Sequence, residues 1–300
     1  MRPILIHEVG PRDGLQAEAG VVPIAVKLDW IRRVADCGVD IVQVGSFVRG
    51  DKVPQLADTD ELFRTLAEES HRALLSALVL NDKGLERALA VGVPLICLGV
   101  SASETHSRKN TGMGTEDAQR RIIALALEAR QAGRRVQVSV QSAFGCGFEG
   151  AIAEDRVRAM VEAYLAAGLT AISLADTAGH AHPAQMKRLV AQVLALEPTA
   201  EVTAHIHDTY GLGMANVYAS MAEGVSTFET SFAGLGGCPF TKVAAGNVAT
   251  EDLVHALQRT GQRKDIDLAA LVAIAKDVAA CFGRDMTGRV HRAGVVEYCS

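Results

Sequence analysis

Residues 171–208 read AISLADTAGHAHPAQMKRLVAQVLALEPTAEVTAHIHD, and the pattern in this stretch decides the fold class. Short apolar runs of strand length stand near its two ends, at 171–176 and 202–208. Between them, Pro183–Leu196 carries apolar residues at helical spacing, and its proline lies in the first turn, where a missing N–H is tolerated. The stretch therefore predicts a strand, a helix and a second strand, the unit from which α/β folds are built.

The same alternation continues along the chain. The strand candidates are 3–9, 40–47, 74–80, 94–101, 135–142, 171–176, 202–208 and 227–233. The amphipathic segments are 24–37, 84–90, 115–132, 154–167, 183–196 and 213–223. Several of these helices are followed by a glycine in the position of a C-cap, namely Gly38, Gly92, Gly133, Gly168 and Gly224.

A (β/α)8 TIM barrel requires eight strands, each followed by a helix, and typically about 250 residues. The count of eight strands favours this fold as a single domain over residues 1–300, with an extra C-terminal helix at Leu268–Phe282 packed outside the barrel. An open, doubly wound sheet is the alternative, because its strands and helices alternate in the same way.

Composition disfavours several classes of protein. The 300 residues are 49% hydrophobic and 22% charged, which is ordinary for a globular protein. A net charge of −5 without a long basic run disfavours nucleic-acid binding, and no apolar run is long enough to span a membrane. The six cysteines are scattered without a C-x-x-C pair, which disfavours a zinc site or a disulfide framework and predicts a cytoplasmic protein.

Polar residues gather where the predicted strands end. In a TIM barrel these ends meet at one mouth, where active sites lie. We therefore expect one shared site for residues that are far apart in the sequence. They are Arg12, Asp13, Gln43, Ser101, Gln141, Asp176, His205, His207 and Ser231.

His205 and His207 indicate a metal site. Histidines at i and i+2 on a strand point to the same face, and imidazole is the commonest metal ligand in proteins. The alternative is a polar strand end that hydrogen-bonds to loops, and two histidines at a barrel mouth favour the metal. Asp13 would add a carboxylate and Asn247 an amide oxygen, a set that suits Mg²⁺ or Mn²⁺.

Three further positions have both a functional and an ordinary interpretation. Arg12, in a turn after the first strand, either lies on the surface or stabilises an oxyanion at the mouth. Cys238, in the glycine-rich AGLGGCPF, is either an inert buried thiol or an accessible acid, base or nucleophile, and we favour the second. Lys109, in SRKN, belongs either to a solvated loop or to a grip on the phosphates of a large substrate.

One partial motif is rejected. GLGMAN, residues 211–216, resembles part of the dinucleotide fingerprint, and Glu229 follows at a suitable distance. The third glycine is missing, however, and histidines stand where a Rossmann fold has a clean apolar strand end.

Four motifs together resemble the 3-hydroxy-3-methylglutaryl-coenzyme A lyase family, which belongs to the metal-dependent TIM-barrel carbon–carbon lyases and synthases. They are EVGPRDGLQAE at 8–18, HIHDTYG at 205–211, AGLGGCPF at 233–240 and GNVATEDL at 246–253. The similarity extends through almost the whole chain, and the combination of a glycine-loop cysteine with H-x-H is highly specific. The resemblance implies a (β/α)8 barrel that cleaves a 3-hydroxyacyl-CoA into acetyl-CoA and a keto acid.

The resemblance also implies a role for each matching residue. The metal ligands are Asp13, His205, His207 and Asn247. Arg12 matches the residue that stabilises the enolate, Cys238 the catalytic cysteine, and Asp176 another mouth residue implicated in activity. Either Asp13 or His205 would accept the proton of the substrate's hydroxyl group. The family further suggests a homodimer.

The acyl pocket departs from the family's pattern. Gln43 stands where these lyases usually carry a glutamate, and Ser139 and Gln141 stand where they tend to have a tyrosine and a serine. With Arg12, Gln16 and Lys109, these residues form the predicted substrate-binding set. The departures make citramalyl-CoA-like and methylmalyl-CoA-like compounds competitors to the classical substrate.

Two other functions stay open. A non-catalytic CoA- or metabolite-binding relative is one, because Gln43 could signal decay, although the ligand set and Cys238 are retained. A condensing enzyme is the other, and the glycine-loop cysteine favours the lyase, because synthases of the superfamily generally lack it.

Overall fold

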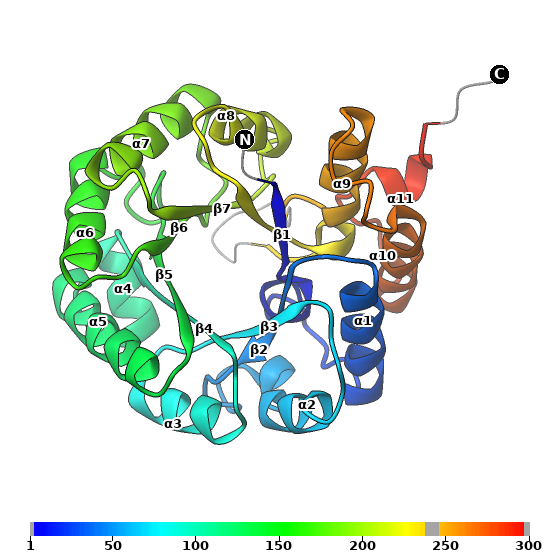
Figure 1. Ribbon diagram of the computed structural model, residues 1–300, viewed down its shortest axis with the longest axis horizontal. Helices are drawn as coiled ribbons and strands as arrows, with labels where there is room; N and C mark the ends of the chain where they lie inside the picture. Colours follow the sequence, from blue (N-terminus) through cyan, green and yellow to red (C-terminus); the bar gives the residue numbers. More distant parts are fainter. Residues whose placement is uncertain (1–2, 238–245, 297–300) are drawn as a thin grey trace.

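A computed structural model describes residues 3–237 and 246–296, and its eight parallel strands close into a barrel in chain order (Figure 1). The last strand pairs with the first, which closes the barrel and excludes the open sheet. The strands are β1 Leu5–Glu8, β2 Ile41–Ser46, β3 Leu74–Leu78, β4 Leu95–Ser101, β5 Arg135–Gln141, β6 Ala171–Asp176, β7 Glu201–Ile206 and β8 Thr227–Thr230.

Helices form a ring around the barrel (Figure 1). The predicted helices are confirmed as α1 Ile24–Asp36, α3 Asp82–Ala90, α5 Thr115–Gln131, α6 Glu154–Ala166, α7 Pro183–Leu196 and α8 Gly213–Ala222. The five glycines expected at helix ends all have positive φ, the conformation that glycine adopts without a steric penalty.

Several short helices were not predicted. They are α2 Thr59–Leu66, α4 Glu104–Thr111, α9 Thr250–Arg259 and α11 Val290–Ala293. Of the two interpretations of SRKN, the solvated loop is wrong, because these residues lie in α4. The Ser103 side chain caps this helix by accepting a hydrogen bond of 3.1 Å from the N–H of His106, and Gly112 ends it in the left-handed conformation.

The extra C-terminal helix is confirmed as α10 Leu268–Phe282, and it packs on α1 and α9 outside the barrel. Asp267 caps its start by accepting a hydrogen bond of 3.0 Å from the N–H of Ala270, and Gly283 ends it with φ +58°. Although α10 is rich in apolar residues, no helix within 3–237 and 246–296 is long and apolar enough to cross a membrane.

The strand register decides which side chains face the barrel interior. Paired residues of neighbouring parallel strands point to the same side, and successive residues alternate between sides. The residues Ala175, His205, Glu229 and His7 are paired in sequence across β6, β7, β8 and β1. His205 faces the barrel interior, so its three partners do as well, whereas Asp176 and its partner Ile206 lie on the side of the helices.

Candidate metal centre and the cavity around it

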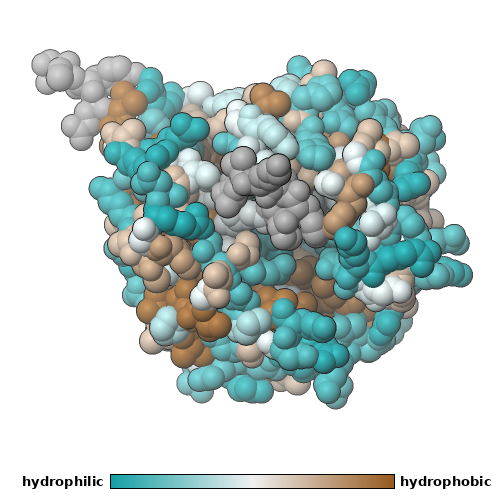
Figure 2. Space-filling model, turned by 180° about the vertical axis from the view of Figure 1, so that it is seen from behind, coloured by the Kyte–Doolittle hydropathy of each residue, from teal (hydrophilic) through white to brown (hydrophobic). Residues whose placement is uncertain are grey.

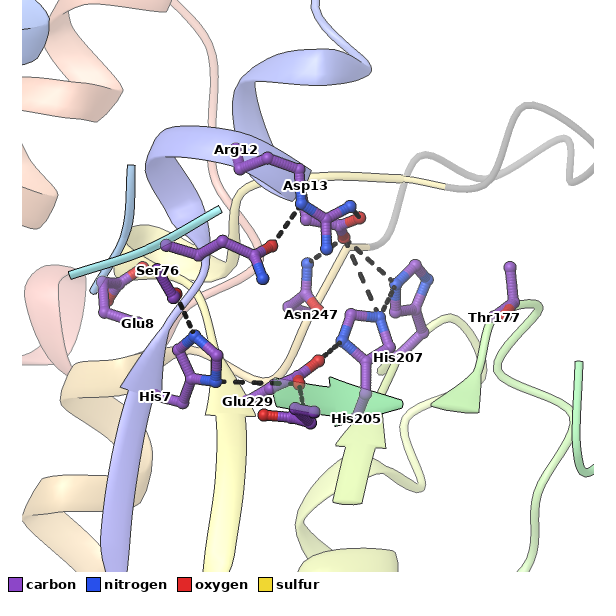
Figure 3. A network of polar contacts seen from close by, with 12 residues as sticks. His7, Glu8, Arg12, Asp13, Ser76, Thr177, His205, His207, Glu229 and Asn247 are labelled. Carbon is purple, nitrogen blue, oxygen red and sulfur yellow. Dashed lines mark hydrogen bonds and ion pairs between the residues drawn. The ribbon is translucent and has the colours of Figure 1, made fainter. Parts of the chain in front are cut away.

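Three segments bring potential metal ligands to the carboxyl ends of the strands. Asp13 lies on η1 (Gly10–Gly14), a single π-helical turn directly after β1. His205 lies in β7, His207 follows it, and Asn247 pairs with His207 through an isolated β-bridge. Their side chains point toward one another in Figure 3. The predicted convergence of residues from distant parts of the chain is therefore present for these ligands. Ser101 and Ser231, which the sequence assigned to the same site, are buried and do not line the cavity described below.

The ligand atoms surround a small space. The Nε2 atoms of His205 and His207 are 3.0 Å apart. The Oδ2 atom of Asp13 lies 3.9 Å from Nε2 of His205 and 3.6 Å from Nε2 of His207. One ligand atom from each of the three residues thus lies within 4.8 Å of the others, which is close enough for a shared ion.

Asn247 completes a donor set that fits a divalent cation. Its Nδ2 donates a hydrogen bond of 2.8 Å to Oδ2 of Asp13, which holds it beside the cluster. Its Oδ1 is buried and has no hydrogen-bond partner among the described residues, and a buried polar atom in this state calls for an explanation. Two imidazole nitrogens, a carboxylate and an amide oxygen would bind a divalent cation that accepts both nitrogen and oxygen ligands.

The charges around the cluster favour ionisation of Asp13. Burial alone would raise the pKa of Asp13, but the Arg12 guanidinium and the two histidines hold it well below its ordinary value. Burial lowers the pKa of His207, which favours the neutral ring that a metal ligand must be. Burial likewise opposes protonation of His205, but hydrogen bonding and the negative charges of Glu229 and Asp13 raise its pKa.

Glu229 was not predicted as part of the site. Its Oε2 lies 2.9 Å from Nδ1 of His205, on the opposite side of the ring from Asp13 (Figure 3). Burial would raise its pKa, yet the pKa falls to about 2 because of the hydrogen bond with His205 and the nearby positive charge. The sequence placed Glu229 in a strand, but only the pairing of β7 with β8 shows that it stands next to His205.

Arg12 is buried next to the ligands. Its Nη1 donates a hydrogen bond of 2.6 Å to Oδ1 of Asp13, and its Nε donates to Oε1 of Gln43. The sequence suggested that Gln43 lies at the end of its strand. It lies inside β2 instead, and it still faces the cavity. The guanidinium is thus held at the metal cluster with a neutral amide as its second partner.

A cavity of about 750 Å³ opens from this cluster. Figure 2 shows that this face of the molecule is hollowed, with many hydrophilic side chains around the hollow. The predicted substrate-binding residues all line the cavity, and they are Arg12, Gln16, Gln43, Lys109, Ser139 and Gln141. Part of the cavity wall is apolar and is formed by Leu78, Leu80 and Cys97.

Basic side chains stand along the cavity as well. Lys109 lies in α4, with Nζ 3.9 Å from the centre of the Phe148 ring. Arg49, Lys52 and Arg121 also line the cavity, and no motif in the sequence predicted them. They are scattered over 49–121, so no basic run marks them in the sequence.

Asp176 does not line the cavity, in contrast to the expectation of a residue facing the mouth. Its carboxylate accepts hydrogen bonds of 2.8 Å and 3.1 Å from the N–H groups of His180 and Ala181. Burial raises its pKa to about 7. The structure thus gives Asp176 a place in ordering the loop between β6 and α7, and a role in activity stays a prediction.

The glycine-rich segment leads from β8 to the cavity, where Gly237 forms part of the lining. Thr287 donates a hydrogen bond of 2.9 Å to the carbonyl of Gly234, and the N–H of Ala233 donates one of 3.0 Å to Glu251. The predicted catalytic residue Cys238 lies outside the described residues, so its role stays a prediction.

Residues 3–278 match the HMGL-like family. The chain is 37% identical over 305 residues to the (R)-citramalyl-CoA lyase of Chloroflexus aurantiacus, covering 99% of this chain and 96% of that protein. It is also 37% identical over 298 residues to the hydroxymethylglutaryl-CoA lyase of Pseudomonas mevalonii, covering 98% and 97%.

Solved structures are similar over nearly the whole chain. The HMG-CoA lyase of Bacillus subtilis superimposes with a TM-score of 0.93 at 32% identity, covering 97% of this chain and 98% of that one. The HMG-CoA lyase of Acinetobacter baumannii, in complex with coenzyme A and 3-methylmalate, gives a TM-score of 0.92 at 36% identity, covering 99% and 98%.

Proposed function

This chain belongs to the HMGL-like family, and on that premise we propose that it is a carbon–carbon lyase that acts on a hydroxyacyl-CoA thioester. The reaction cleaves a 3-hydroxy-3-methylglutaryl-CoA-like substrate into acetyl-CoA and a keto acid, which is acetoacetate for the classical substrate. The observation that carries the proposal is the cluster of Asp13, His205 and His207 with Arg12 at the wall of one cavity.

The site residues divide the chemistry among them. Mg²⁺ or Mn²⁺, held by Asp13, His205, His207 and Asn247, would make the substrate's hydroxyl group more acidic and orient it. Either Asp13 or His205 accepts the hydroxyl proton. The C2–C3 bond then breaks, the carbonyl of the keto acid forms, and the electron pair of that bond moves into the thioester enolate.

Arg12 and Cys238 complete the reaction. The guanidinium of Arg12 stabilises the negative charge of the enolate oxygen, because it is already fixed by Asp13 and Gln43. Cys238 gives its thiol proton to the enolate carbon, which yields acetyl-CoA. A covalent intermediate is not required.

The same mechanism on a shorter hydroxyacyl group is the second candidate. Gln43 removes a negative charge that the family usually has near the metal, and Ser139 and Gln141 replace the usual tyrosine and serine around the acyl group. A citramalyl-CoA-like or methylmalyl-CoA-like substrate is therefore in competition with the classical one. The similarity to a relative named (R)-citramalyl-CoA lyase supports this candidate.

The experiment is a direct assay of the thioesters. The purified chain is incubated with Mg²⁺ and each of 3-hydroxy-3-methylglutaryl-CoA, citramalyl-CoA and methylmalyl-CoA, and the acyl-CoA and keto-acid products are separated and quantified. Asp13→Asn is the inactive comparison, and Asp29→Asn, at an exposed helical position, is the matched control. Binding of CoA without cleavage of any thioester would refute the lyase and favour a non-catalytic binding protein.

A further inference from the structure

Glu229 lies behind the candidate metal site, and the proposed reaction does not use it. It is buried inside the barrel, with Oε2 at 2.9 Å from Nδ1 of His205. Among the described residues, the cluster of potential ligand atoms includes Asp13, His205 and His207 but not Glu229. Its carboxylate therefore contacts the His205 ring and is not itself a ligand of the ion.

The position of Glu229 selects one form of the His205 ring. A neutral imidazole carries one proton, and a carboxylate beside Nδ1 accepts that proton's hydrogen bond. The lone pair then lies on Nε2, the atom that faces His207 and Asp13. In the other tautomer, Nε2 would carry the proton and could not bind a metal.

Other strands hold the carboxylate of Glu229 in place. Gln137 on β5 donates a hydrogen bond of 2.7 Å from Nε2 to Oε1 of Glu229. His7 on β1 places Nδ1 3.7 Å from the same oxygen, and its Nε2 is 2.9 Å from the hydroxyl of Ser76 on β3. The carboxylate thus has a neighbour on each side and little freedom to rotate away from His205.

We propose that Glu229 is a positioning residue that fixes the Nδ1–H tautomer of His205 and so raises the affinity of the site for a divalent cation. The inference rests on the proposed function only in requiring that Asp13, His205 and His207 bind the cation. It does not depend on which thioester is the substrate, nor on Cys238. It does assign the hydroxyl proton to Asp13, because a His205 ring with a proton on Nδ1 and the cation on Nε2 has no lone pair left.

The test measures Mn²⁺ binding to the whole chain in the absence of substrate, by electron paramagnetic resonance of free Mn²⁺. Glu229→Gln keeps the size of the side chain but replaces the charged acceptor, and one orientation of its amide stabilises the wrong tautomer. We expect Mn²⁺ to bind about 10- to 100-fold more weakly, the range found when partners of metal-binding histidines are removed.

The chain provides a matched control in a second buried Glu–His pair. Glu251 lies 3.0 Å from Nδ1 of His291, and neither residue belongs to the cluster of potential ligands, so Glu251→Gln should leave the Mn²⁺ affinity unchanged. Gln137→Leu leaves Glu229 in place but removes its amide donor, and we expect a weakening smaller than that of Glu229→Gln. It also serves as the second variant if Glu229→Gln does not fold.

Nitrogen-15 NMR of the Mg²⁺-loaded protein gives an independent measurement of the tautomer. The His205 ring should carry its proton on Nδ1 in the wild type and should lose that preference in Glu229→Gln. Equal Mn²⁺ affinity in the wild type, Glu229→Gln and Gln137→Leu would overturn the inference while leaving the proposed function intact. A wild-type chain that binds no Mn²⁺ would overturn both.

Discussion

Replacing Glu8 by glutamine should remove a pH-dependent loss of stability from the centre of the fold. Glu8 is buried at the end of β1, and its Oε1 accepts hydrogen bonds of 2.6 Å from the N–H of Gly10 and 3.0 Å from the N–H of Phe232. The hydroxyl of Thr250 lies 2.5 Å from its Oε2. Glu8 thereby connects the turn that carries Arg12 to the start of the glycine-rich segment.

The magnitude follows from the pKa of Glu8. Burial raises it from 4.5 to about 8, so the folded protein keeps this carboxyl group neutral at pH values where the unfolded chain ionises it. The stability contributed by the neutral group is complete below the unfolded pKa and is lost as the pH rises through the folded pKa. At 1.36 kcal/mol per pKa unit, the loss between pH 5 and pH 8 is about 4 kcal/mol.

Glutamine cannot ionise, and its amide can still accept from both N–H groups and donate to the hydroxyl of Thr250. The free energy of unfolding of the wild type should therefore fall relative to that of Glu8→Gln as the pH rises. The assay is urea unfolding of both proteins at pH values between 5 and 8, followed by circular dichroism. Glu86→Gln, at an exposed helical position, is the control. A difference between Glu8→Gln and wild type that stays constant with pH would refute the reasoning.

Two further changes test the glycine-rich segment and the acyl pocket. Gly246→Ala places a Cβ atom 2.6 Å from the carbonyl oxygen of Gly234, so the glycine-rich segment must shift. We expect thermal unfolding to show a destabilisation of about 1 to 3 kcal/mol. We also expect a loss of lyase activity. An unchanged melting temperature would show that the segment tolerates the methyl group. Gln43→Glu adds a carboxylate beside Arg12, so the ratio of kcat/KM for 3-hydroxy-3-methylglutaryl-CoA over citramalyl-CoA should rise. A ratio equal to that of the wild type would exclude Gln43 as a determinant of substrate choice.

The fold could be predicted because its signals are local and repeated. Each apolar run has strand length, and glycines such as Gly168 and Gly224 end helices in the left-handed conformation that favours them. The helix α4 could not be predicted from periodicity because its eight residues, ETHSRKNT, are polar and show no apolar face. The helix α2 does bury Leu62, Phe63 and Leu66 on one face, a pattern that favours a helix. Tertiary contacts and caps such as Ser103 stabilise these helices.

The site could be predicted only in part, because the sequence of one strand does not show which residues of the neighbouring strand it pairs with. The i, i+2 spacing was enough to place His205 and His207 on one face. Glu229 required the register of β7 against β8, which the sequence does not reveal. The prediction for Asp176 failed for the same reason. The register pairs Asp176 with Ile206 and turns its side chain toward the helices, not toward the cavity.

The most direct test of the central claim is the dependence of thioester cleavage on a divalent cation bound by Asp13, His205 and His207. The chain is stripped of metal with a chelator, and release of the acyl-CoA product from the preferred thioester is followed as Mg²⁺ is added back to the wild type and to His207→Ala. We expect no release without the cation, full recovery in the wild type and none in the variant at the same Mg²⁺ concentration. Undiminished release from the stripped wild type would contradict the account.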